Sequence, residues 1–124
     1  MNHVVQVLLL AAAGGVGTLL RVCCTTLLAR LLGHAFPWGT LAVNVAGSFA
    51  CGAVVSLARG RGLAPGTEAI LLVGLLGGFT TYSSFALQSI EMLHAGRSAA
   101  ALGYVVATNV AGLAAAWAGL RSWR

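Results

Sequence analysis

Residues 74–85 read GLLGGFTTYSSF, with two adjacent glycines and four serine or threonine side chains inside a long apolar stretch. Each glycine in a helix interior costs about 1 kcal/mol relative to alanine, and threonine is also a poor helix former. We therefore expect a helix that is broken near Gly77–Thr81. Because apolar sequence continues on both sides, the break is expected at membrane depth.

The predicted break has a chemical consequence for the backbone. Lipid cannot satisfy amide and carbonyl groups that a break leaves unpaired, so such groups persist only where protein buries them or an ion binds them. Carbonyl oxygens are suitable ligands for a small hard cation such as Na⁺. The stretch therefore predicts a cation site as well as a break.

The composition places this stretch in an integral membrane protein. Of the 124 residues, 59% are hydrophobic and 7% are charged, whereas soluble domains carry about 25% charged residues. So few charges cannot cover the surface of a soluble globule. A soluble enzyme domain, a disordered chain and a disulfide-stapled secreted module are thereby excluded.

Four apolar segments divide the chain, and each can cross about 30 Å of hydrocarbon at roughly 1.5 Å per helical residue. They cover residues 4–32, 37–58, 68–93 and 98–120. The connectors are short, so nothing outside the membrane is large enough to be a domain. We expect an all-α, multi-pass protein in which residues 1–124 form a single transmembrane domain.

The charged residues are few and scattered. All seven cations are arginines without a basic run, and this distribution argues against nucleic-acid binding and for contact with lipid headgroups. Four arginines (Arg59, Arg61, Arg121 and Arg124) share one side of a four-span topology, and two (Arg30 and Arg97) share the other. Such a weak bias permits insertion in both orientations, and hence an antiparallel homodimer.

No group of residues in the sequence predicts catalysis. There is no nucleophile–histidine–acid set, no phosphate-binding loop and no histidine or cysteine cluster. The three cysteines, Cys23, Cys24 and Cys51, lie in apolar stretches and are expected to be reduced. We therefore do not expect an enzyme.

Polar side chains in the second and third spans predict a pathway for an anion. Asn44 shares a helix face with Thr40 and Ser48, and its amide needs a partner helix or water, so interhelical bonding is the competing interpretation. Tyr82 and Phe85 are three residues apart and share a face, and their ring edges can face an anion weakly. Simple packing of these two rings is the alternative.

Neutral hydroxyl donors add to the predicted lining of this anion pathway. Ser83 and Ser84 lie between the two aromatic residues, and Tyr104 and Thr108 share a face of the fourth span. Donors without full charge would bind an anion and still release it, as conduction requires. Arg21 in the first span would raise the local anion concentration at a vestibule, unless it extends to the headgroups.

Three motifs resemble the Fluc (CrcB) fluoride-channel family in their order and spacing. They are Gly14-Gly15-x-Gly17-x-x-x-Arg21, then Gly39-Thr40-Leu41-x-Val43-Asn44-x-x-Gly47-Ser48-Phe49, then Gly77-Gly78-Phe79-Thr80-Thr81-Tyr82-Ser83-Ser84-Phe85. The last two are specific, and the resemblance covers essentially the whole chain.

The resemblance implies a passive fluoride-selective channel in the cell inner (plasma) membrane. It implies an antiparallel, dual-topology homodimer with two pores, which exports F⁻ and so relieves fluoride toxicity. It also implies a central structural Na⁺ held by backbone carbonyls that match Gly77 and Thr80. The pore residues it implies match those singled out above: Asn44, Tyr82, Ser83, Ser84, Phe85, Tyr104 and Thr108.

One position departs from the family pattern, which usually has Phe where this chain has Tyr82. The ring edge is retained, but the phenol adds a donor that could hold F⁻ longer, so we expect selectivity to be kept.

The main rival interpretation is a small multidrug exporter, which is also a four-span antiparallel dimer. That mechanism needs a carboxylate in the middle of the first span, and residues 8–18 contain none. A third interpretation is a membrane subunit that transports nothing.

Overall fold

The computed structural model describes residues 2–123, and Arg124 lies outside them. Within this range the regular elements are all helices. Four helical segments are long and apolar enough to cross a membrane: His3–Leu32, Trp38–Arg61, Pro65–His94 and Ser98–Arg121. They lie close to the four segments expected from the sequence.

The first two long helices have clear end signals. Helix α1 (His3–Leu32) begins where the Asn2 side chain accepts a hydrogen bond from the Val4 amide at 3.0 Å. Helix α2 (Trp38–Arg61) ends at Gly62, whose left-handed backbone (φ 70°) suits glycine. The connector after α2 is therefore shorter than the expected loop of residues 59–67.

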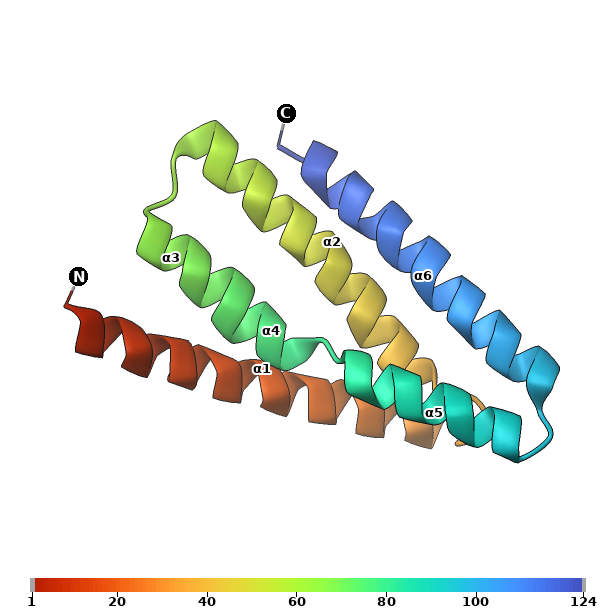
Figure 1. Ribbon diagram of the computed structural model, residues 1–124. Coiled ribbons are helices and arrows are strands. Elements are labelled where there is room, and N and C mark those ends of the chain that lie inside the picture. Colours follow the sequence, from red (N-terminus) through yellow and green to blue (C-terminus); the bar gives the residue numbers. More distant parts are fainter. Residues whose placement is uncertain (1, 124) are drawn as a thin grey trace.

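The third segment consists of several elements. It contains α3 (Pro65–Ala69), a π-helix over Ile70–Leu76, α4 (Gly77–Phe79) and α5 (Tyr82–His94). Thr80 and Thr81 have extended backbone (φ/ψ −83°/160° and −151°/117°). Figure 1 shows the chain leaving the helical ribbon between α4 and α5. The two glycines are helical, so the irregular backbone is confined to the two threonines.

Helix α6 (Ser98–Arg121) runs beside α2 and forms the most extensive helix pair of the fold (Figure 1). Close approach depends on glycine from each helix. A Cβ on Gly52 would overlap the Ala116 carbonyl, and one on Gly119 would overlap the Phe49 carbonyl. Small residues thus bring the two backbones into contact, as in other membrane helix pairs.

Helix α1 packs against the third segment in the same way. A Cβ on Gly17 would overlap the Leu75 carbonyl, and one on Gly78 would overlap the Gly14 carbonyl. The π-helix and α4 are therefore held directly against α1. This contact fixes the position of the chain just before the two extended threonines.

One end of the bundle presents stacked arginine and tryptophan side chains. Both termini lie at the end where α2 leads into α3 (Figure 1). There Arg121 stacks over Trp117 at 3.9 Å from its ring centroid, and Arg61 stacks over Trp123 at 5.1 Å. Such aromatic and arginine pairs are typical of a membrane–water interface.

Much of the outer surface is apolar. The exposed side chains include many leucines and valines of α1 and α6. A surface of this kind is stable against lipid tails or another membrane protein, and it agrees with a multi-pass membrane protein.

Candidate functional site: a clamped helix interruption beside an uncharged pocket

Asn44 of α2 forms two hydrogen bonds with the backbone of Thr81. The Asn44 Nδ2 group donates to the Thr81 carbonyl at 2.9 Å, and the Thr81 amide donates to Asn44 Oδ1 at 2.8 Å. One amide side chain therefore satisfies both polar backbone groups of Thr81. This bonding favours the interhelical role that the sequence left open for Asn44.

Thr81 also starts the next helix. It is the N-cap of α5, and its Oγ1 accepts a hydrogen bond from the Ser84 amide at 3.3 Å. The same hydroxyl donates to Ser84 Oγ at 3.1 Å and lies 3.4 Å from Ser83 Oγ. Thr81 is buried, so its side chain and backbone together anchor the start of α5.

Thr80 is held by a different set of contacts. Its Oγ1 donates to the Leu76 carbonyl at 2.9 Å, and its amide donates to the same carbonyl at 3.0 Å. Its methyl group lies over Gly47 of α2, where a Cβ would overlap it. Gly47 and Asn44 are three residues apart on α2 and together receive the two extended threonines.

The resemblance implies the carbonyls of Gly77 and Thr80 as cation ligands. Within residues 2–123, the Thr80 carbonyl accepts no hydrogen bond from backbone or side chain. Gly77 is exposed and Thr80 is half-buried on the surface of the subunit. Unpaired carbonyl oxygens are chemically suited to a hard cation.

A pocket of about 370 Å³ lies beside these threonines, between α2, α5 and α6. We call it the central pocket. Its lining consists of Asn44, Ser48, Cys51, Thr80, Thr81, Tyr82, Phe85, Thr108, Asn109, Gly112 and Ala116. None of these side chains carries a charge at neutral pH. The hydroxyls of Ser48, Thr80 and Thr81 donate within the chain. The donors left for a ligand are the hydroxyls of Thr108 and Tyr82 and the second Nδ2 hydrogens of Asn44 and Asn109.

Aromatic rings lead from the central pocket into the core. The rings of Tyr82 and Phe85 have centroids 5.7 Å apart, and those of Phe85 and Tyr104 are 5.2 Å apart, both pairs tilted. Tyr82 is 79% exposed, whereas Phe85 is 8% and Tyr104 0% exposed. The structure thus brings together the two predicted ring residues, and Tyr104 continues the row.

Thr108 contributes an unpaired hydroxyl to the central pocket. Its Oγ1 is buried and has no hydrogen-bond partner among the described residues. Buried polar groups in folded proteins are nearly always hydrogen-bonded, and an exception calls for an explanation. A ligand that accepts hydrogen bonds would supply the missing partner.

Tyr104 lies between the central pocket and a second one, and it lines neither. Its hydroxyl donates to Gln88 Oε1 at 2.8 Å, and the buried side chain of Thr40 lies against the same hydroxyl. Thr40 shares the polar face of α2 with Asn44, and Gln88 is a site residue that the sequence pattern did not predict. Gln88 follows Phe85 by three residues, so the signal was a polar side chain continuing the aromatic face of α5.

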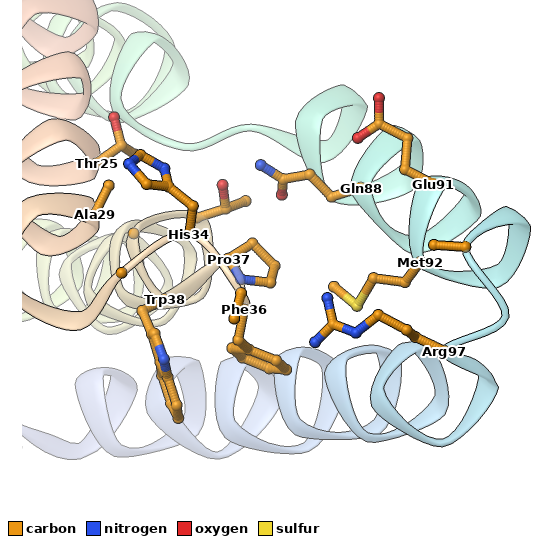
Figure 2. Close-up of a pocket in the computed structure, with 15 residues that line it drawn as sticks. Thr25, Ala29, His34, Phe36, Pro37, Trp38, Gln88, Glu91, Met92 and Arg97 are labelled. Atoms are coloured by element: carbon orange, nitrogen blue, oxygen red, sulfur yellow. The ribbon is translucent and has the colours of Figure 1, made fainter.

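The second pocket, also of about 370 Å³, opens at the end where α1 meets α2 and α5 meets α6. We call it the mouth pocket. Its polar lining includes Thr25, His34, Thr40, Gln88, Glu91 and Arg97. Figure 2 shows Gln88 and Arg97 projecting into it from two sides, while the Glu91 carboxylate points outward.

The remaining predicted site residues lie outside both pockets. Ser83 and Ser84 face the Thr81 hydroxyl and do not line the central pocket. Arg21 is half-buried on α1, one turn before Thr25, and its Nε has no hydrogen-bond partner in the described chain. The structure therefore places Arg21 near the mouth pocket rather than in it.

Acidic and thiol ligands do not gather anywhere in the described part of the chain. No group of three histidine, cysteine, aspartate or glutamate residues there is placed to hold a metal ion. The three cysteines are free.

Comparison with known proteins gives matches over the length of the chain. The family described as "CrcB-like protein, Camphor Resistance (CrcB)" matches residues 8–120. A protein of Rhizobium leguminosarum named "Fluoride-specific ion channel FluC" is 43% identical over 121 residues, which are 97% of each chain. A protein of the same name from Chelativorans is 44% identical over 116 residues, 93% of each chain.

A third relative covers the whole chain. The "Fluoride-specific ion channel FluC" of Rhizobium meliloti is 39% identical over 125 residues, which are 100% of this chain and 98% of its own. These relatives are named as ion channels, which are not enzymes. From the family match and these identities, the chain belongs to the CrcB family.

Proposed function

We propose that this protein is a passive channel selective for fluoride. Its relatives carry the name of fluoride-specific ion channels over nearly the full length of the chain. The observation that carries the proposal is the central pocket, where neutral donors and aromatic rings meet around an unpaired buried hydroxyl.

The chemistry of the central pocket favours a small anion. The free Thr108 hydroxyl and the second Nδ2 hydrogen of Asn44 can donate hydrogen bonds that replace water around F⁻, and the ring edges of Tyr82 and Phe85 are electropositive. Because no lining residue is cationic, the ion is not trapped, and conduction needs such a balance between entry and release.

The proposed route leads from the central pocket to the mouth pocket. Phe85 packs against Tyr104, and the Tyr104 hydroxyl is bonded to Gln88, which lines the mouth. Arg21 and Arg97 would then raise the local anion concentration near the mouth.

We further propose that the channel is an antiparallel homodimer with two pores. Gly77 is exposed on the single subunit and lies inside the third apolar segment, where lipid would not satisfy an unpaired carbonyl. A second, inverted subunit would cover it, and the weak arginine bias permits such an inversion. The apolar faces of the helices supply surface for this contact.

The same proposal includes a structural Na⁺ at the centre of the dimer. Gly77 and Thr80 of each subunit would hold it with their backbone carbonyls, and the Thr80 carbonyl has no other hydrogen bond in the described chain. When bound, the cation balances the partial negative charge of those oxygens. The chain's own contribution is to keep the carbonyls free of other donors and fixed in direction.

Flux through such a channel would lower fluoride inside the cell. Fluoride enters acidified cells as neutral HF and ionises there, so a passive path in the inner membrane lets F⁻ leave. One end of the bundle carries the stacked Arg–Trp pairs, and this end would lie at the headgroups of that membrane.

The alternative of a multidrug exporter is less well supported by the structure. Proton-coupled export of a cationic drug needs a carboxylate in the binding site, and the central pocket has none. Within the described chain, Glu91 lies at the mouth pocket with its carboxylate turned outward, and Glu68 lies in the first turn of α3. Neither acid reaches the pocket at the helix interruption.

Efflux from proteoliposomes tests the proposed function. Vesicles loaded with KF or KCl, with valinomycin to carry the counter-ion, are monitored with ion-selective electrodes. Rapid F⁻ efflux with little Cl⁻ efflux is the expected result. Equal efflux of both halides would contradict selectivity, and no efflux of either would favour the non-transporting subunit.

A further inference from the structure

We infer that Asn44 is a positioning residue that aims the Thr80 carbonyl at the proposed cation. The inference rests on the proposed function, because it concerns the Na⁺ site included there. It starts from the two hydrogen bonds that join the Asn44 amide to the backbone of Thr81.

The first bond fixes a peptide plane. The Thr81 amide and the Thr80 carbonyl belong to the same peptide unit, which is planar and trans, so they point to opposite sides. Because the Thr81 amide donates to Asn44 Oδ1, the Thr80 carbonyl must point away from Asn44. The direction of this carbonyl is therefore set by a side chain of α2.

The second bond decides which carbonyls remain available. Asn44 Nδ2 donates to the Thr81 carbonyl, which is thereby occupied, whereas the Thr80 carbonyl accepts no hydrogen bond in the described chain. A single amide thus satisfies one carbonyl of the interruption and leaves its neighbour free. The free Thr80 carbonyl is one of the proposed ligands.

The other side chains around the two threonines do not bond to this backbone from another helix, so the positioning role belongs to Asn44. The Thr81 hydroxyl is used in capping α5, and the Thr80 hydroxyl is used within its own segment. Gly47 only makes room for the Thr80 methyl group. Within residues 2–123, the Asn44 side chain is the polar group from another helix that bonds to the Thr80–Thr81 backbone.

This role differs from that of a pore donor. Asn44 lines the central pocket, and Nδ2 has a second hydrogen that the Thr81 carbonyl does not use. Loss of fluoride flux in an Asn44 variant would therefore not separate the two roles. A measurement of cation binding does separate them.

The test is a titration of thermal stability with Na⁺. Purified wild-type protein in detergent is melted in NaCl at constant ionic strength, with N-methyl-D-glucamine chloride as the replacement salt. The wild-type midpoint temperature should rise with Na⁺. In Asn44→Ala the Na⁺ concentration for the half-maximal rise should be about 10- to 100-fold higher, since residues that orient metal ligands typically change affinity by that factor.

Asn109→Ala is the matched control. Asn109 is also an asparagine in a membrane-spanning helix, but its Nδ2 bonds to the Val105 carbonyl of its own helix. Its Na⁺ titration should match that of wild type. If Asn44→Ala does not yield helical, monodisperse protein, Asn44→Ser is used, because a serine hydroxyl is too short to reproduce both bonds.

Hydrogen exchange supplies a second readout. The Thr81 amide should exchange faster in the Asn44 variant than in wild type, because its acceptor is gone. Two results would overturn the inference. One is a wild-type melting temperature that does not change with Na⁺ concentration. The other is an Asn44 variant whose half-maximal rise occurs at the wild-type Na⁺ concentration. A wild-type protein that binds Na⁺ but passes no F⁻ would instead overturn the proposed function alone.

Discussion

Replacing Thr108 by valine is expected to lower flux without lowering stability. Valine has nearly the shape of threonine, so packing in α6 is retained, and only the hydroxyl is removed. That hydroxyl is buried without a partner. A buried polar group left unpaired costs about 1–3 kcal/mol. Thr108→Val should therefore raise the free energy of unfolding or leave it unchanged.

The effect on flux follows from the same atom. If F⁻ is the missing partner, the ion loses one hydrogen bond, and hydrogen bonds to charged groups are worth about 1.5–3 kcal/mol. Where this loss adds to the transport barrier, each 1.36 kcal/mol slows the rate tenfold, so F⁻ flux should fall roughly ten- to a hundredfold. The change is local, so the structure around it should be unaffected.

Two measurements on the same preparation test this reasoning. Thermal melting in detergent reports stability, and electrode-monitored efflux from KF-loaded vesicles reports flux. A destabilised Thr108→Val protein would mean that the hydroxyl already has a partner. Wild-type flux would mean that the ion does not meet it.

Three further substitutions give expectations of different kinds. Phe85→Ile should lower F⁻ flux severalfold, because the Phe85 ring packs between those of Tyr82 and Tyr104. Size-exclusion chromatography should still show folded protein. Unchanged flux would show that the ring only packs. Tyr82→Phe should retain selectivity for F⁻ over Cl⁻, because the Tyr82 hydroxyl has no hydrogen bond in the described chain and the ring is 79% exposed; Cl⁻ efflux from the variant would contradict this. Gly17→Val should destabilise the fold by about 1–3 kcal/mol or more in a melting assay, since its Cβ would overlap the Leu75 carbonyl; an unchanged melting temperature would contradict that close contact.

The main features of the fold could be predicted because they depend on local sequence. Apolar length gives the four spans, and the expected and observed ends differ by at most three residues. Gly33 and Gly62 end the first two helices with positive φ, as glycine permits. The π-helix over Ile70–Leu76 was not predicted, since hydrophobic periodicity does not distinguish it from α-helix.

The residues of the candidate site could be predicted from the sequence better than the contacts between them. The residue types around the threonines indicated a polar pocket with two aromatic rings, and the structure brings Asn44, Tyr82, Phe85 and Thr108 to one pocket. The bonds between Asn44 and Thr81 join residues 37 positions apart and depend on how α2 packs. Gln88 was missed because its partner, Tyr104, lies on another helix.

The uncharged lining of the central pocket has a consequence for acid environments. Its side chains include no histidine, aspartate, glutamate or lysine, so no lining residue changes its charge between about pH 5 and pH 8. A cell exposed to acid would thus keep an inner passage whose own side chains stay neutral.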